Sequence, residues 1–186
     1  MLAPRPVALG PKLAKAAGLL GVLLAVVLGG PLVEGALLSE AGPPVQVAPD
    51  VRLAPLSGWR LAAAQGGARP ALLTRGSGNL AVLEAATGGD TAALLGAYLR
   101  ERLKPASADL LVGDVEPVLA AGVVAARVAY RGQFDAADRR GALAGELTAL
   151  VSPAGTGVVF DAWAMADTYP YERQDAAAMI AHAQVR

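Results

Sequence analysis

Residues that could carry acid–base or nucleophilic chemistry are few in this chain of 186 residues. The only histidine, His182, is flanked by alanines, with no serine or carboxylate placed to work with it as a general base. Ser77, in the stretch "TRGSGNL", lacks the first glycine and the following helix of a nucleophile elbow. Cysteine is absent, which excludes thiolate nucleophiles, thiolate metal ligands and disulfides. We therefore predict no catalytic residue and no enzymatic activity.

Paired carboxylates could support glycoside hydrolysis. Asp135 and Asp138 lie in the polar stretch "DAADRRG" beside Arg139 and Arg140, which is typical of a solvated loop. No stretch has the closely alternating Asp or Asn residues and terminal Glu of a calcium loop. The sequence therefore predicts neither a metal ion nor a cofactor.

Asp161 is the one polar residue that stands out by its position. It interrupts an apolar stretch between Phe160 and Trp163, and period-two alternation places it on the same strand face as Trp163. Because antiparallel sheets often expose one face, the ordinary interpretation is an aspartate on a half-solvated face. The alternative is a ligand or partner surface, for which the candidates are Trp59, Asp161 and Trp163. Trp59, in "VRLAPLSGWR", is more simply interpreted as a core or rim residue.

Charge and hydropathy narrow the class of protein. The chain has 16 basic and 16 acidic residues, so it lacks the basic excess of a nucleic-acid-binding protein, and no nucleic-acid partner is expected. Hydrophobic residues make up 54% of the sequence and mean hydropathy is +0.44, which is high for a domain without a membrane segment.

The N-terminal part is typical of a membrane segment. Ala16 to Val33 is a run of 18 residues without a charge, which as a helix would span roughly 27 Å of a hydrocarbon core of about 30 Å. Cationic residues precede this run, acidic residues follow it, and the first later cation is Arg52. The positive flank is expected to stay in the cytoplasm. We therefore predict a cytoplasmic N-terminus over 1–15, a single transmembrane anchor over 16–38 and an extracytoplasmic C-terminal domain at the cell membrane.

A cleaved signal peptide is the main alternative, because it has the same polarity and an apolar region of about 7–15 residues. Ser39-Glu40-Ala41 has small residues at a spacing that a signal peptidase accepts. A buried core helix is a further alternative, which the length and one-sided charge disfavour. Residues 39–50 include three prolines, and we expect a semi-rigid extended linker there.

Residues 51–186 have the patterns of an α+β domain. Asp90 is a good N-cap for a helix that Pro105 ends, and a second helix is expected over 172–185. The buried stripe of the first helix is expected to comprise Ala92, Leu95, Leu99 and Leu103, flanked by Leu94 and Tyr98. Strands are expected at 51–53, 59–63, 71–75, 79–85, 124–134, 142–151 and 158–165, with a weaker one within 110–119.

Successive strands joined by short turns must be antiparallel, so the expected fold is an antiparallel sheet with helices packed against it. This order resembles the PsbP-like family, which includes the extrinsic PsbP subunits of photosystem II, the Mog nuclear-transport factors and exported proteins of high-GC bacteria. The resemblance covers residues 51–186. The stretches that carry it are "VRLAPLSGW", "DTAALLGAYLRERL", "ARVAYRGQF" and "GALAGELTALVSPAGTGVVFDAWA".

The resemblance implies an α-β-α sandwich that binds other macromolecules and has no enzymatic activity. The membrane segment is a departure from the photosynthetic members. The expected function is that of a membrane-anchored extracytoplasmic interaction domain, an accessory or assembly subunit whose partners are the membrane and other membrane-protein subunits. The alternative is an exported small-molecule or lipid-binding module with a pocket near Trp59, Asp161 and Trp163.

Overall fold

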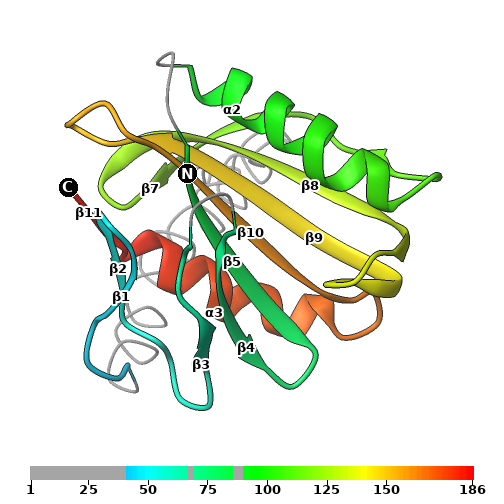
Figure 1. Ribbon diagram of the computed structural model, residues 1–186, viewed down its shortest axis with the longest axis horizontal. Helices are drawn as coiled ribbons and strands as arrows, with labels where there is room; N and C mark the ends of the chain where they lie inside the picture. The colour runs from blue at the N-terminus through cyan, green and yellow to red at the C-terminus, as the bar shows by residue number, and fades with distance from the viewer. Residues whose placement is uncertain (1–40, 67–68, 86–89) are drawn as a thin grey trace, which may run out of the picture. The chain divides into compact units, whose positions relative to one another are not determined.

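A computed structural model describes residues 41–66, 69–85 and 90–186 (Figure 1). The predicted cytoplasmic segment 1–15 and the predicted anchor 16–38 lie outside these residues. Within the described ranges, no helix is both long enough and apolar enough to cross a membrane. The described residues all belong to one compact unit, Glu40–Arg186.

An antiparallel sheet forms the centre of this unit, as the strand patterns predict. Its strands, in spatial order, are β3 (Arg60–Ala63), β4 (Ala71–Arg75), β5 (Gly78–Ala85), β10 (Gly157–Met165), β9 (Arg140–Val151), β8 (Val123–Asp135) and β6 (Leu111–Val112), with β7 (Glu116–Ala120) also paired to β8. The weak strand expected within 110–119 is thus two short strands, both of which pair with β8.

A smaller sheet contains β1 (Val45–Ala48), β2 (Val51–Leu53) and β11 (Gln184–Val185), with β2 in the middle. β1 lies within the stretch expected to be a linker, so that prediction is wrong for 45–48. The reason is local: Val47 and Ala48 are buried, and a tight turn brings β1 back against β2. The folded part therefore begins before residue 51.

The first helix begins where predicted, because the Asp90 side chain accepts a hydrogen bond from the backbone N–H of Ala92 (2.9 Å). It comprises α2 (Thr91–Tyr98), a π-helical turn (Leu99–Leu103) and a final 3₁₀ turn. Its buried residues differ in part from the predicted stripe, since Ala92 is exposed and Leu99 is half-buried. The π-helical turn explains the difference at Leu99, because its five-residue spacing puts the buried Leu103 on the same side as Tyr98.

The second helix, α3 (Tyr169–Ala181), begins three residues before the predicted start. Pro170 lies in its first turn, where a missing N–H leaves no intrahelical bond unmade. Its residues Ala176, Met179 and Ile180 are buried. The helix ends at Ala181 and is capped by the exposed His182, so the prediction of helix up to residue 185 is wrong for Gln184 and Val185, which pair with β2 as β11.

The two helices lie on opposite faces of the large sheet (Figure 1). Asp161 is in register with Ala81 and Leu147, so these side chains share one face, where they pack with the α2 residues Leu95 and Tyr98. The alternate residues, among them Phe160, face α3. The predicted arrangement of an antiparallel sheet between helices is therefore confirmed, and both faces of the central strand β10 are covered.

Candidate functional site

Asp161 lies in the middle of β10 and has no exposed surface. β10 pairs with β5 on one side and β9 on the other, so the backbone at this position is closed in by neighbouring strands. α2 covers the face to which the side chain belongs. The expected half-solvated face is therefore wrong for Asp161, because a helix packs on each side of the sheet. A carboxylate buried this deeply requires partners.

Three side chains supply those partners. Asp161 Oδ1 accepts a hydrogen bond from the Tyr130 hydroxyl (2.6 Å). Asp161 Oδ2 accepts one from the Tyr98 hydroxyl (3.0 Å) and one from an Arg139 guanidinium nitrogen (3.0 Å). We call Asp161, Arg139, Tyr98 and Tyr130 the Asp161 cluster. It joins α2, β8, β10 and the β8–β9 connection, so four parts of the chain meet at one carboxylate.

Arg139 comes from the polar connection that was predicted to be a solvated loop. That prediction holds for Arg140, whose side chain is 77% exposed, but it is wrong for Arg139, whose side chain is 4% exposed. The Arg139 guanidinium turns inward, lies 4.2 Å from the Trp163 ring centroid and 5.9 Å from that of Phe134, and ends at Asp161. Stacking on aromatic faces and a carboxylate partner together offset the cost of burying the cation.

Burial sets the protonation of the two tyrosines. It raises the pKa of the Tyr98 and Tyr130 hydroxyls well above the usual value, and the nearby charge of Asp161 raises both further. For Arg139, burial opposes the charged form, but the pKa is raised overall because Asp161 and the two tyrosines favour the cation. Both tyrosines therefore remain hydrogen-bond donors at neutral pH.

Gly145 on β9 provides the space for Tyr130. A Cβ atom at position 145 would lie 2.5 Å from the Tyr130 hydroxyl oxygen and 2.6 Å from the Ala162 carbonyl oxygen. Since real Cβ contacts are longer than this, glycine is the residue that lets the tyrosine lie flat on the sheet. The geometry of the Asp161 cluster therefore also depends on the glycine at position 145 of β9.

The Asp161 cluster has the composition of an acid–base site but not its accessibility. Its carboxylate and guanidinium are directed at each other, and both tyrosine hydroxyls are used as donors to Asp161. In the parts of the chain that the structure describes, no group of three His, Cys, Asp or Glu side chains is arranged to hold a metal ion. The arrangement can fix α2 and the β8–β9 connection to the sheet, which is a structural role.

Trp59, the third predicted surface residue, belongs to a separate cluster near α3. Arg75 on β4 pairs with Glu172 (2.9 Å) and with Asp175, both on α3, and lies 5.4 Å from the centroid of the Trp59 ring. The Trp59 indole N–H points to Asp175 Oδ2 at 3.4 Å. We call Trp59, Arg75, Glu172 and Asp175 the Arg75 cluster. It lies on the α3 side of the sheet.

The structure brings Asp161 and Trp163 together, as the alternation predicts, and places Trp59 on the other side of the sheet. All three are buried, at 0%, 4% and 6% exposure. In the described part of the chain, these three side chains therefore form no shared exposed surface and do not line the opening of a pocket. Sequence reasoning placed Arg139 in solvent and did not single out Tyr98 or Tyr130. The signal that could have found them is the lone aspartate of an apolar strand, because such a charge requires a buried cation and donors.

A third polar group lies between β9 and α3. Glu146 pairs with Arg173 on α3 and lies 3.8 Å from Arg127 on β8, which also pairs with Glu116 (3.1 Å). The Tyr169 hydroxyl is buried near this group and has no hydrogen-bond partner among the residues that the structure describes. Burial raises the pKa of Tyr169, and the charge of Glu146 raises it further. This group includes the most solvent-accessible side chains of the three polar groups, those of Glu116 (63% exposed) and Arg173 (49% exposed).

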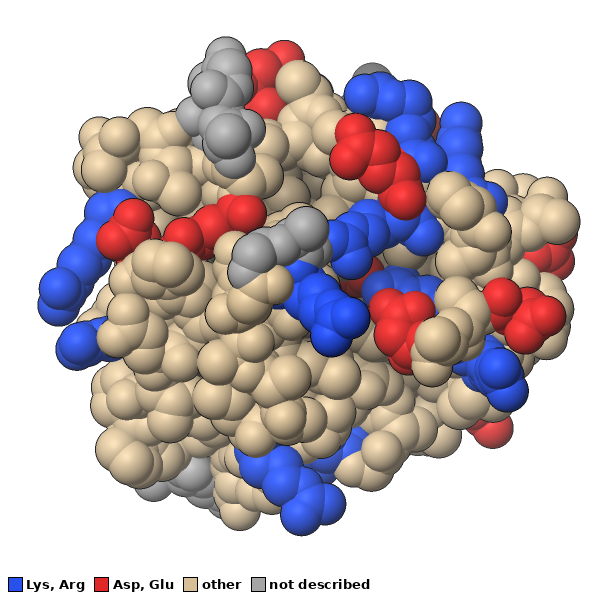
Figure 2. Space-filling model, in the orientation of Figure 1, with Lys and Arg blue, Asp and Glu red and all other residues tan. Residues whose placement is uncertain are grey.

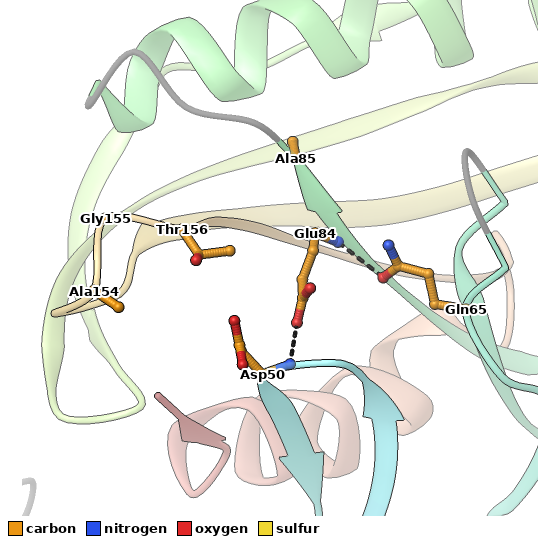
Figure 3. Close-up of a pocket in the computed structure, with 7 residues that line it drawn as sticks. All are labelled: Asp50, Gln65, Glu84, Ala85, Ala154, Gly155 and Thr156. Atoms are coloured by element: carbon orange, nitrogen blue, oxygen red, sulfur yellow. Dashed lines mark hydrogen bonds between the residues drawn. The ribbon is translucent and has the colours of Figure 1, made fainter.

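An open polar pocket of about 420 Å³ lies at the turn between β1 and β2 (Figure 3). The Asp50 N–H donates to Glu84 Oε1 (2.6 Å), and the Glu84 N–H donates to Gln65 Oε1 (3.0 Å). The Asp50 carboxylate and the Thr156 hydroxyl also face this space (Figure 3). These bonds tie the small sheet to β5, and the pocket contains none of the residues predicted to bind a ligand.

Charged groups on the face shown in Figure 2 are of both signs and interspersed, with broad uncharged areas between them. No single-sign patch dominates this view. Electrostatics on this face therefore indicate no strong preference for an anionic or a cationic polymer.

Comparisons with known proteins locate the fold. No protein-family model matches the chain, and no curated protein matches it. Among solved structures, it is similar to cyanobacterial PsbP (CyanoP) from Synechocystis sp. PCC 6803, with 14% identity, a TM-score of 0.53, and coverage of 74% of this chain and 87% of that one. It is also similar to LpqN of Mycobacterium tuberculosis, a protein involved in cell envelope biogenesis, with 15% identity, a TM-score of 0.50, and coverage of 77% and 89%. The structure therefore has the PsbP-like fold that the strand and helix order predicts.

Proposed function

We propose that this protein is a non-catalytic interaction domain on the extracytoplasmic side of the cell membrane, tethered by its N-terminal apolar segment. In this role it serves as an accessory or assembly subunit of a larger membrane-protein complex. The observation that carries the proposal is the closure of the Asp161 cluster. The side chains best suited to acid–base chemistry bond to one another and hold α2 to the sheet. Recognition of a partner would then be carried by surface residues.

Two further observations support the location. The sequence has an 18-residue uncharged run preceded by Arg5, Lys12 and Lys15 and followed by acidic residues, the polarity of an anchor with its C-terminal side outside. The fold is shared with LpqN, a protein involved in cell envelope biogenesis, and with CyanoP. An interaction domain close to a membrane is consistent with both.

Purification of the tagged full-length protein from its own membranes in mild detergent, followed by cross-linking and mass spectrometry, tests the proposal. Lys104 is the only lysine after residue 40, so amine-reactive reagents would report on a single point of the domain. Reagents that join carboxylates suit this chain better, because exposed acidic residues such as Asp138 and Glu116 occur at several places on the domain.

The proposal predicts reproducible cross-links from the domain to the subunits of one membrane complex. Recovery of the full-length protein alone and monodisperse, without cross-links to any membrane protein, would contradict it. Recovery of a soluble form that begins near Gly42 would show that the apolar run is a cleaved signal, and would replace the tethered domain by an exported one.

A further inference from the structure

The turn end of the β7–β8 hairpin is unusually apolar. Ten residues without a charge, 117–126, separate Glu116 from Arg127, and they form the end of β7, the turn and the start of β8. Leu119 and Val124 face each other across the two strands, and they are 74% and 75% exposed. We call residues 117–126 the hairpin tip. Two large aliphatic side chains in adjacent positions are thus held in water.

The turn itself avoids polar residues at a conformational cost. Its two central residues, Ala121 and Gly122, have φ values of +50° and +75°. Two-residue hairpin turns with positive φ strongly favour Asn-Gly or Asp-Gly, because a Cβ atom is strained in this region. Among the described residues, Ala121 is the only non-glycine residue with positive φ. Alanine replaces the polar residue that usually occupies this position. This replacement is expected if the turn enters an apolar phase, where an Asn or Asp side chain would be unfavourable.

The hairpin tip is firmly held on its other face. Ala120 and Ala125 alternate with Leu119 and Val124 along the strands, and they are only 3% and 2% exposed. One face of the tip therefore packs into the domain while the opposite face presents Leu119 and Val124. A fixed pair of exposed side chains loses little conformational freedom on binding, unlike a loop that must first become ordered.

We propose that the hairpin tip inserts Leu119 and Val124 into the interfacial layer of the bilayer to which the chain is tethered. This inference rests on the tether in the proposed function. The Gly42 N–H is bonded to the Pro55 carbonyl, so the folded part holds the chain from there, and only residues 34–41 separate it from the uncharged run. Eight extended residues reach at most about 29 Å, which keeps the domain beside the membrane.

Other occupants fit less well. β7 lies at an edge of the sheet, but Pro117 has no N–H to offer an added strand, and proline on an edge strand is a common protection against such pairing. Stable protein–protein interfaces use roughly 20–30 residues a side, far more than two aliphatic side chains at a turn. A lipid surface has no such size requirement.

The free energy expected from inserting two side chains is small, but it is sufficient for a domain that is already tethered to the membrane. When burial is complete, each leucine or valine side chain raises the partition coefficient from water into an apolar phase by roughly 10- to 100-fold. Two such side chains would hold a free protein on a membrane only weakly. The tether makes the second contact intramolecular, so the same gain is enough to orient the domain.

Site-specific fluorescence on the full-length chain in vesicles tests this inference. The chain has no cysteine, so Val124→Cys introduces a single labelling site for an environment-sensitive fluorophore. The probe membrane is phosphatidylcholine with phosphatidylglycerol, with or without nitroxide-labelled lipid. We expect the label at position 124 to shift to the blue and to lose emission when nitroxide lipid is present. Adding Leu119→Asp should abolish both changes without lowering the Tm, because Leu119 is exposed.

Tyr171→Cys is the matched control. Tyr171 is 80% exposed and lies near the start of α3, which follows the Met165 end of β10. The hairpin turn lies towards the Gly157 end of β10, since Ala125 pairs with Leu150 and Leu150 with Val158. A label at position 171 should therefore stay in water and resist quenching.

Carbonate extraction of the same vesicles separates the two proposals. Retention of the protein with the label at position 124 in water would overturn the insertion and leave the tether intact. Release of the protein by carbonate would overturn the tether, and the insertion with it. Shielding of position 124 in native membranes but not in pure lipid would assign the hairpin tip to a protein partner and overturn the lipid assignment.

Discussion

The Asp161 and Arg75 clusters have the same ingredients at two depths. In each, an arginine pairs with a carboxylate and lies over a tryptophan ring: the Arg139 guanidinium is 4.2 Å from the centroid of the neighbouring Trp163 ring, and the Arg75 guanidinium is 5.4 Å from that of Trp59. The Arg139 side chain is 4% exposed, whereas that of Arg75 is 33% exposed. We therefore expect accessibility to water, more than the identity of the partners, to decide how much each ion pair contributes to the free energy of unfolding.

Removing Arg139 should have the largest effect. Arg139→Met leaves Asp161 buried with two neutral donors and no cation, and losing one partner of a buried pair costs about 3–5 kcal/mol. Urea unfolding of the full-length protein, followed by tryptophan fluorescence, measures this loss. Arg140→Met is the control, because the Arg140 side chain is 77% exposed, and its expected change is within about 0.5 kcal/mol. Equal effects of the two substitutions would contradict the buried pair.

Tyr130→Phe should have the next largest effect. It removes the 2.6 Å hydrogen bond to Asp161, and bonds to charged groups contribute about 1.5–3 kcal/mol. Tyr169→Phe is the matched substitution, since the Tyr169 hydroxyl is also buried but has no hydrogen-bond partner in the described part of the chain. It should leave the free energy of unfolding unchanged or raise it slightly. A larger loss from Tyr169→Phe than from Tyr130→Phe would reverse the assignment of the two hydroxyls.

Gly145→Ala tests the space beneath Tyr130. The added methyl group would meet the tyrosine ring and a backbone carbonyl, and overpacking of this kind costs about 1–3 kcal/mol. Gly66→Ala is the control, because a Cβ atom there would meet no described atom within 4 Å other than those of its chain neighbours. Thermal unfolding of both variants gives the difference. A Tm for Gly145→Ala equal to that of the wild-type protein would mean that the Tyr130 ring has room to move.

Arg75→Met should have the smallest effect of the series. Its partners Glu172 and Asp175 are partly exposed and can be rehydrated, so the expected loss is about 1 kcal/mol or less. The loss should shrink further as salt is added, because screening weakens accessible ion pairs. The effect of Arg139→Met should change little with salt. Equal salt dependence at the two sites would remove the distinction between the clusters.

The sheet could be predicted from the sequence because period-two alternation depends only on local pattern. β8, β9 and β10 lie within one or two residues of their expected bounds. β1 was missed because it is flanked by Pro44 and Pro49, as a linker segment would be, and its burial depends on contacts with β2 and β5. The π-helical turn was missed because helix periodicity assumes a constant 3.6 residues per turn.

The candidate site was predicted only in part, for a physical reason. Alternation places Asp161 beside Trp163, but it cannot tell which face a second helix covers, so the aspartate was expected in water. Arg139 lies in a charged stretch whose composition is that of a solvated loop. Its inward direction is set by Asp161, a contact 22 residues away that no local pattern contains.

The claim that the Asp161 cluster has a structural role is tested most directly with a folded variant in which the buried Arg139–Asp161 pair has been replaced. Asp161→Asn with Arg139→Met removes both charges while the asparagine can still bond to the tyrosines, so stability should recover much of what Arg139→Met alone loses. The full-length double variant is then purified and cross-linked from native membranes beside the wild-type protein. If the Asp161 cluster acts only in structure, both proteins should give the same set of cross-linked membrane proteins. Loss of those partners by a double variant that is as well folded as the wild type would contradict it, because the Asp161 cluster would then act in function and not only in structure.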